Sequence, residues 1–344
     1  MSNDDVSNDD VTNDKNAAGR GTSHAGKQTT QVLDSADLTR NRPAKLVEVM
    51  GDTQHNETGT SLLAGAFQRL RKSPAAIIGA IIVLVFVLVA VLAPVLAPYE
   101  PSSVQWANQI SATSLPPVDA DHPLGLDPFG SDLLTQLIYG ARQSLVIGVV
   151  STALGLIGGA VIGAIAGAFG GWVDTLVMRV VDILLSVPAL LMAVSVAAVM
   201  GRRPEALMVA IAAAQVPIFA RLLRGAMLKQ RNQDYVLAAD SLGLRRRTVV
   251  MSHILPNSVG PVIVQATLTL ATAIIEVAAL SYLGLGAPNP TVAEWGRMLV
   301  KAQERLDTAP HLTLLPGLCI AVTALGFTLF GEALREALDP KGRK

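Results

Sequence analysis

The amino-acid sequence predicts an all-α polytopic membrane protein with six transmembrane helices and a disordered N-terminal tail. The 344-residue chain is 51% hydrophobic and only 16% charged, whereas soluble domains are about one quarter charged. Apolar segments recur along the chain after residue 70, and a helix needs roughly 20 such residues to cross a bilayer. The expected spans are 75–98, 143–173, 183–201 with a start near 176, 204–220, 254–283 and 312–331. Each must be helical, because backbone polar groups in lipid are satisfied only within their own segment.

The composition also excludes several function classes. Lys plus Arg and Asp plus Glu each total 27, so the chain has no net basic field for binding nucleic acid. A single cysteine excludes an internal disulfide framework and any multi-cysteine metal site. Four parts are expected, and they are a disordered cytoplasmic tail (1–60), an interfacial helix with the first span (61–98), an external loop (99–142) and a five-helix core (143–340).

The N-terminal tail is rich in Asp, Asn, Ser and Thr and opens with a short repeat, SNDDV, at 2–6 and 7–11. It contains too little apolar surface to offset the entropy of ordering the chain. We expect a linker, with a regulatory or docking tail as the alternative.

The distribution of basic residues predicts the orientation. With the N-terminus in the cytoplasm, 21 of the 27 Lys and Arg residues lie on the cytoplasmic side, as the positive-inside rule requires. Arg202 and Arg203 run against this rule, since they fall in a very short external loop. We therefore expect a multi-pass protein of a bacterial inner membrane with both termini in the cytoplasm, in contact with membrane lipid.

The second span carries a glycine at every fourth position. Such a row forms a groove without side chains, which lets another helix approach closely. We interpret it as static packing, with a seam that moves during transport as the alternative. The glycines are Gly155, Gly159, Gly163, Gly167 and Gly171.

Charged residues within spans are costly and often functional. Asp174, Arg179 and Asp182 cluster at the cytoplasmic end of the third span and are candidates for an interhelical ion pair. Arg179 and Asp182 are three residues apart and can also pair on one helical face. Glu276 lies deeper, in the fifth span. It could face a water-filled pathway and meet a peptide amino group, or it could bond a neighbouring helix.

The cytoplasmic loop 227–256 predicts a compact helix–glycine–helix element. An Ala-rich helix from Asp234 ends at Gly243, which can adopt the left-handed cap conformation. A basic cluster follows, and a second short helix runs from about Thr248 to Pro256, where the next span begins. An element of this shape is suited to a cleft on another protein.

This loop resembles the coupling loop of permease subunits of bacterial dipeptide, oligopeptide and nickel ABC importers. The resemblance extends over residues 62–340 and implies their six-helix permease fold. Its motifs are HPLG at 122–125, GGWVD at 170–174, RVVDIL at 179–184, ALSYLGLG at 279–286 and ALDP at 337–340. The coupling residues it implies are Asp234, Ala238, Ala239, Asp240, Gly243, Ile254, Leu255 and Pro256. Leu237 stands where the family usually has Glu.

The resemblance implies a membrane permease that is not an enzyme, driven by two separate ATPase subunits. A phosphate-binding loop ends in Gly-Lys-Ser or Gly-Lys-Thr, and the chain's only Gly-Lys pair, at 26–27, is followed by Gln28. The other implied partners are a homologous second permease, a solute-binding protein and a peptide substrate. We expect no metal and no cofactor in this chain.

Three alternatives stay open. The same architecture could carry a nickel chelate or another small solute. A stand-alone secondary transporter would be expected to show internal repeats, and a membrane hydrolase would need a nucleophile and a base. Genomic neighbours that encode an ATPase and a binding protein would separate the importers from the other two classes.

Overall fold

The computed structural model describes residues 67–110, 119–289 and 292–338. Within these ranges all regular elements are helical, apart from one isolated bridge between Leu126 and Asp132. The predicted all-α fold class is therefore confirmed. The predicted disordered tail, 1–60, lies outside the described residues.

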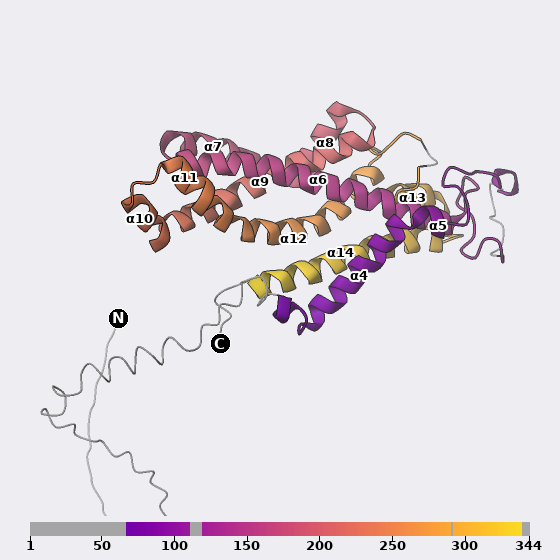
Figure 1. The fold of residues 1–344 in the computed structure, drawn as a ribbon. Helices are drawn as coiled ribbons and strands as arrows, with labels where there is room; N and C mark the ends of the chain where they lie inside the picture. The colour runs from indigo at the N-terminus through magenta and orange to yellow at the C-terminus, as the bar shows by residue number, and fades with distance from the viewer. Residues whose placement is uncertain (1–66, 111–118, 290–291, 339–344) are drawn as a thin grey trace, which may run out of the picture. The chain divides into compact units, whose positions relative to one another are not determined.

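The helices are numbered as in Figure 1. They are α4 (Pro74–Val91), α5 (Ala93–Leu96), α6 (Leu133–Phe169), α7 (Gly171–Ser186), α8 (Ala189–Met200), α9 (Pro204–Arg231), α10 (Asp234–Ser241), α11 (Arg246–Val249), α12 (Leu255–Tyr282), α13 (Trp295–Ala302) and α14 (His311–Leu338). Three shorter segments are η1 (Ala107–Gln109), the π-helical η2 (Val250–Ile254) and η3 (Gln303–Arg305). The long helices run between two ends, which we call the α10 end and the α13 end after the short helices found there (Figure 1).

Five helices among the described residues are long and apolar enough to cross a membrane, and α7 with α8, bent by 93° at their break, makes a sixth if the pair is counted as one span. The bend follows from Pro188. A proline disfavours the α conformation in the residue before it, and Val187 is extended, with φ −87° and ψ 129°. The third span was predicted as one straight helix, and this part of the prediction is wrong.

Two other predicted boundaries differ. The expected external loop, 99–142, is shorter because α6 already begins at Leu133, where Asp132 accepts a hydrogen bond from the Thr135 N–H at 2.8 Å. With 37 residues, α6 is roughly 55 Å long at 1.5 Å per residue. It therefore extends well beyond a hydrocarbon core of about 30 Å.

The fifth span begins earlier than predicted, because α11, η2 and α12 form one continuous helix from Arg246. Pro256 thus lies inside that helix and does not mark its rigid start. Proline has no N–H and crowds the preceding turn. The wider π turn next to it relieves both problems, with the Leu255 N–H bonded to the Val250 carbonyl five residues back.

The glycine row of α6 packs against α9, and the two helices run in the same direction (Figure 1). A Cβ placed on Gly159 would lie 2.5 Å from the Phe219 Cβ, and one on Gly163 would lie 2.5 Å from the Ala220 carbonyl oxygen. Gly155 and Gly167 have similarly close neighbours on α9. The predicted close-packing seam is thus present at four of its five glycines.

Gly171 does not belong to the seam. It is the first residue of α7, has φ +58°, and a Cβ placed on it would have no heavy atom within 4 Å. Gly170 before it has φ +64°, so α6 ends at this tight turn and the period-four row ends with it.

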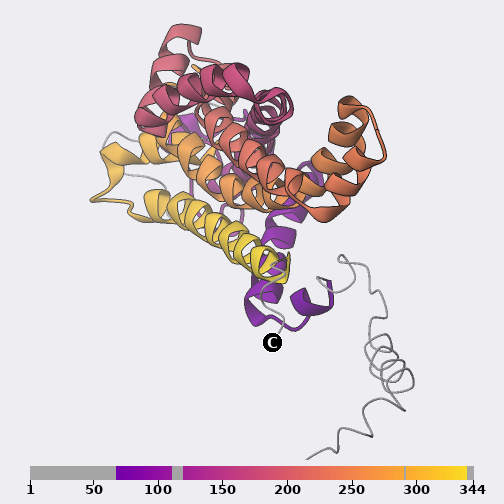
Figure 2. The same cartoon turned by 90° about the vertical axis from the view of Figure 1, so that its left-hand side faces the viewer.

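Glycines also allow α14 to pack closely against its neighbouring helices. A Cβ on Gly326 would lie 2.6 Å from Ile82 of α4, and one on Gly331 would lie 2.6 Å from Leu268 of α12. In Figure 2 the C-terminal helix accordingly runs beside α12. These close contacts leave α12 packed between α14 on one side and α6 with α9 on the other.

Candidate functional site

Residues 234–254 form a compact projection at the α10 end, which we call the knob. Gly243 makes its turn with φ +74°, a left-handed conformation that favours glycine. The Gly243 N–H bonds the Asp240 carbonyl at 3.0 Å, and the Leu244 N–H bonds the Ala239 carbonyl at 3.3 Å. The predicted glycine cap of α10 is therefore confirmed.

One face of the knob is buried against its own chain. Val236, Ala239, Val249 and Ile254 pack with Met227 of α9 in one apolar cluster. Ala239 was expected to pack in a groove of a partner protein, and this is wrong because its side chain is already buried inside the molecule. Ala238, its neighbour, is exposed and keeps that role as a prediction.

Arg246 ties the knob to the end of α6. Its guanidinium donates to the main-chain carbonyls of Ala168 and Phe169, at 2.8 and 3.0 Å. The last carbonyls of a helix have no partner within the helix and carry partial negative charge, so an arginine satisfies them well. On the other side, the Tyr235 hydroxyl donates to Gln230 of α9 at 2.8 Å.

Several apolar side chains of the knob are exposed. Leu242 is 82% exposed and Leu237 is 55% exposed. Leu244 and Met251 are exposed as well. Of the predicted coupling residues, Asp234, Ala238, Asp240, Gly243 and Pro256 are exposed too, whereas Leu255 is half-buried and Ile254 is buried.

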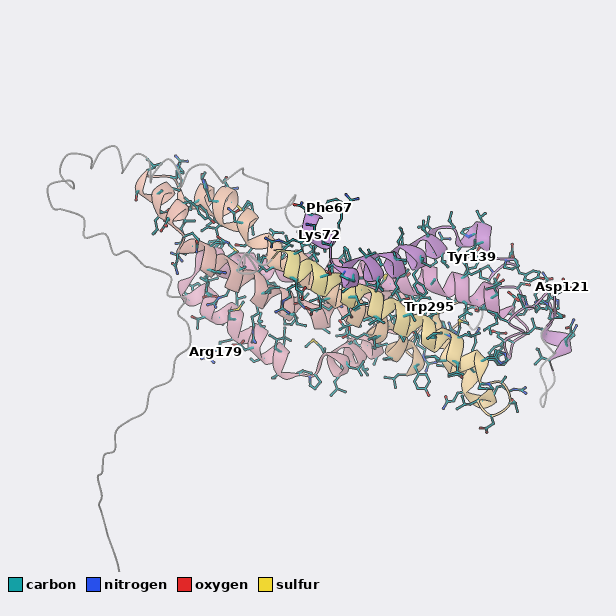
Figure 3. The ribbon with its side chains drawn as sticks, turned by 90° about the horizontal axis from the view of Figure 1, so that it is seen from below. Phe67, Lys72, Asp121, Tyr139, Arg179 and Trp295 are labelled. Atoms are coloured by element: carbon teal, nitrogen blue, oxygen red, sulfur yellow. The ribbon has the colours of Figure 1, made fainter. Side chains whose placement is uncertain are left out.

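Two ion pairs join α7 to α9 close to this end. Asp174 pairs with Arg224 through both carboxylate oxygens, at 2.9 and 2.6 Å. Asp182 pairs with Arg221. The predicted pairing of Arg179 with Asp182 is therefore wrong, because the carboxylate reaches α9 instead; no ion pair of Arg179 occurs within the described part of the chain. Figure 3 shows Arg179 at the outer edge of the structure.

Glu276 lies on a polar stripe of α12. The stripe consists of Gln265, Thr269, Thr272 and Glu276, which follow the helical repeat along one face. Gln265 donates to the Thr269 hydroxyl at 3.2 Å. Glu276 is half-buried, and its Oε2 has no hydrogen-bond partner among the described residues. A polar face of this kind on a spanning helix is costly in lipid, so it must meet water or protein.

The α13 end is held together by buried groups that sequence reasoning did not find. Trp295 is fully buried among the long helices (Figure 3), and its indole N–H donates to the Leu137 carbonyl at 3.1 Å. Lys301 of α13 pairs with Asp127 at 3.0 Å, and both side chains are buried. No local pattern could reveal a pair whose members are separated by more than half of the chain.

Glu294 precedes α13 and caps it, accepting hydrogen bonds from the N–H groups of Gly296 and Arg297 at 2.8 and 3.3 Å. Burial raises the pKa of its carboxyl, and these hydrogen bonds act in the opposite direction. A carboxylate is favourable there because the first N–H groups of a helix have no partner within the helix.

The chain matches known proteins over most of its length. Residues 159–344 match the family described as the binding-protein-dependent transport system inner membrane component, and residues 61–117 match the N-terminal transmembrane domain of oligopeptide transport permease C. The dipeptide transport system permease protein of Alkalihalophilus pseudofirmus is 41% identical over 284 residues, which cover 83% of this chain and 91% of that protein.

Two further relatives are similar over shorter stretches. The di/tripeptide transport system permease protein of Pseudomonas aeruginosa is 43% identical over 218 residues, covering 63% of this chain and 72% of that protein. The glutathione transport system permease protein of Pectobacterium atrosepticum is 40% identical over 220 residues, covering 64% and 73%. The long apolar helices agree with membership in a family of inner-membrane components. The chain belongs to the inner-membrane permease components of binding-protein-dependent ABC importers.

Proposed function

We propose that this permease carries dipeptides or oligopeptides into the cytoplasm and that its knob transmits the force of ATP hydrolysis. The observation that carries the proposal is the knob itself, an element anchored on its own chain that leaves an apolar surface exposed. The N-terminus and the α10 end lie in the cytoplasm, and the α13 end lies outside. This orientation rests on the distribution of Lys and Arg.

The partners are two ATPase subunits, a paralogous second permease and an extracytoplasmic solute-binding protein. The exposed face of the knob sits in a groove of one ATPase. Closure of the ATPases on ATP moves the knob, and the helix bundle changes from inward-open to outward-open, because each state is stabilised by different contacts.

The contact with the ATPase is mainly apolar. Exposed apolar side chains outside lipid are typical of protein interfaces when they gather in a patch, and Leu237, Leu242 and Met251 are exposed on the knob. Leu237 replaces the Glu that the family usually has at this position, so a charged contact gives way to an apolar one. The buried Ala239 stabilises the knob by packing in the apolar cluster that joins it to α9.

Substituting Leu242→Asp tests this contact without disturbing the fold, because the side chain is almost fully exposed. ATP-driven uptake and co-purification of the ATPase with the permease should both fall about tenfold or more. Leu306→Asp is the matched control, an exposed leucine at the α13 end, and should retain both. Full uptake by the Leu242 variant would remove the proposed role of this surface.

Gly243 offers a second test of the same element. A Cβ would meet no atom within 4 Å there, so the constraint is the positive φ alone. Gly243→Val should abolish coupling, whereas Gly243→Asn should retain much of it, since asparagine tolerates left-handed backbone. Equal uptake by the two variants would show that the turn geometry is not needed.

The polar stripe of α12 lines the translocation pathway, and Glu276 meets the amino group of the peptide there. Its unpartnered carboxylate oxygen and the exposed Thr272 beside it support this assignment. Glu276→Gln should lower uptake about tenfold with the complex still assembled. Glu332→Gln, on the exposed end of α14, is the control. Unchanged uptake by the Glu276 variant would indicate an interhelical role.

Peptides are the favoured substrate because a relative that matches 83% of this chain is named for dipeptide transport. Competition between labelled dipeptide and a nickel chelate tests this choice. Uptake of the dipeptide that the chelate does not inhibit is expected. Preferential uptake of nickel would transfer the same mechanism to a different solute.

A further inference from the structure

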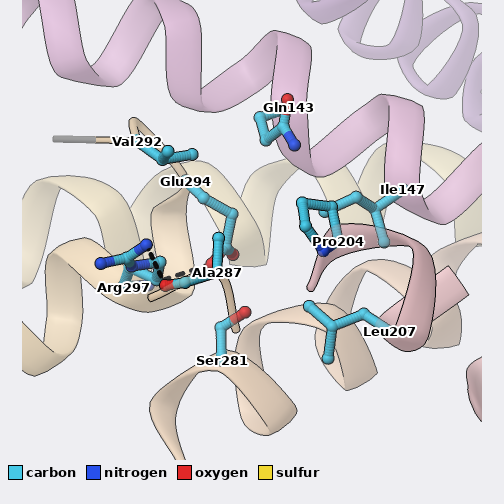
Figure 4. Close-up of a pocket in the computed structure, with 9 residues that line it drawn as sticks. All are labelled: Gln143, Ile147, Pro204, Leu207, Ser281, Ala287, Val292, Glu294 and Arg297. Atoms are coloured by element: carbon cyan, nitrogen blue, oxygen red, sulfur yellow. Dashed lines mark hydrogen bonds between the residues drawn. The ribbon is translucent and has the colours of Figure 1, made fainter. Parts of the chain in front are cut away.

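A cavity of about 480 Å³ opens at the α13 end, between the turn after α12, the α8–α9 turn and α13. Its volume falls within the range of small-molecule sites. The walls near the end of α12 are formed by small residues, Gly284, Gly286 and Ala287, which leave room for a ligand. Ser281 lines this cavity and also a smaller inner pocket that reaches toward α6 and α9 (Figure 4).

Cationic side chains dominate the cavity wall. Arg202, Arg297, Lys301 and Arg305 line it, and Glu304 is the only acidic residue among the described lining residues. Asp127 neutralises Lys301 at 3.0 Å, and the ammonium also lies 5.3 Å from the centre of the Phe129 ring. Because Asp127 neutralises its charge, Lys301 shapes the wall and adds little positive charge to it.

Arg297 is held in place by its own chain. Its guanidinium donates to the Ala287 carbonyl, as Figure 4 shows. Burial lowers the pKa of Arg297, and the nearby Glu294 acts in the opposite direction. A half-buried guanidinium that is already oriented loses little conformational entropy when it binds an anion.

Arg202 is the second guanidinium group of the cavity wall. It comes from the turn between α8 and α9, and among the described residues its side chain has no hydrogen bond or ion pair. Its neighbour Arg203 instead donates to the Met200 carbonyl at the end of α8, at 3.5 Å. Both run against the distribution of basic residues that sets the orientation. The hydrogen bond to the end of α8 gives Arg203 a structural role in this turn. Arg202 has no such bond among the described residues, and the feature it faces is the cavity.

We propose that this cavity binds the C-terminal carboxylate of the incoming peptide, with Arg202 and Arg297 as its ligands. The inference rests on the proposed peptide substrate and on the α13 end lying outside. Guanidinium groups bind carboxylates through paired hydrogen bonds. The recessed position of Lys301 and Arg297 favours a small ligand over the surface of a partner protein, which could reach only the rim.

The direct test is chemical protection of the arginines in the assembled transporter. Phenylglyoxal modifies accessible guanidinium groups, and mass spectrometry measures the extent at each arginine. Free Ala-Ala should slow modification of Arg202 at least threefold, whereas its C-terminal amide, Ala-Ala-NH2, should not. Arg203 should react equally with and without either peptide. Equal protection by acid and amide, or none at 50 mM peptide, would overturn the proposal.

Uptake measurements test whether the cavity acts during transport. Arg202→Gln should lower the ratio of free-acid to amide uptake about tenfold, and the control Arg203→Gln should leave that ratio unchanged. If Arg202→Gln weakens binding-protein docking and lowers both uptakes equally, the cavity serves the partner and the proposal fails. Wild-type uptake is measured in the same preparation. If the wild-type transporter takes up no peptide, the peptide assignment fails. If it takes up peptide but Arg202→Gln leaves the ratio of free-acid to amide uptake unchanged, only the carboxylate site fails.

Discussion

The glycine seam between α6 and α9 makes a quantitative prediction about stability. The perturbation is Gly163→Ala, which adds one methyl group at the closest part of the seam. That Cβ would lie 2.5 Å from the Ala220 carbonyl oxygen and 3.1 Å from the Ala220 Cα. Ordinary contacts begin near 3.4 Å, so the two helices must separate by roughly 1 Å here, and a gap of that size forfeits a quarter to a half of each neighbouring dispersion contact.

The matched control is Gly225→Ala on α9, where a Cβ would have no heavy atom within 4 Å. Both substitutions gain up to about 1 kcal/mol of helix propensity. Their difference therefore isolates the overpacking cost, for which about 1–3 kcal/mol is expected. Titration of purified protein with a denaturing detergent in mixed micelles gives the free energy of unfolding of each variant. Equal values for the two variants would refute the close approach of α6 and α9.

Four further substitutions test contacts at both ends of the bundle, three by the same unfolding titration and one by hydrogen exchange. Arg224→Gln removes a two-point, partly buried pair with Asp174 and should cost about 1.5–3 kcal/mol. Arg221→Gln, which breaks an exposed pair, should cost only about 0.2–1 kcal/mol, and the reverse order would contradict the burial of the first pair. Trp295→Phe loses an indole hydrogen bond to α6 and should cost about 1 kcal/mol or more, so no loss would argue against that bond. Arg246→Gln frees the end of α6 and should speed hydrogen exchange in the knob, while unchanged exchange would show that the tether is dispensable.

Much of the fold follows from patterns that are local in sequence. Apolar length alone predicts the long helices, because lipid leaves the backbone no alternative. The four-residue spacing of Gly155 to Gly167 predicts a close helix contact, and Gly243 predicts the cap of α10. Each of these features depends on residues within one or two helical turns.

The parts that could not be predicted depend on contacts between distant segments. Arg179 lies three residues from Asp182, but Arg221 on α9 is the partner that the fold brings to that carboxylate. The burial of Ala239 depends on α9 and α11 packing behind it. The same reason explains the cavity, whose cations come from the α8–α9 turn, from α13 and from η3.

Reconstitution in proteoliposomes tests the central claim most directly. The permease pair, its ATPases and its binding protein are assembled, and uptake of labelled dipeptide is measured with and without ATP. We predict uptake only when ATP and the ATPase subunits are both present, with loss of uptake in the Leu242→Asp variant. Uptake by the permease alone, driven by a proton or sodium gradient, would contradict the account.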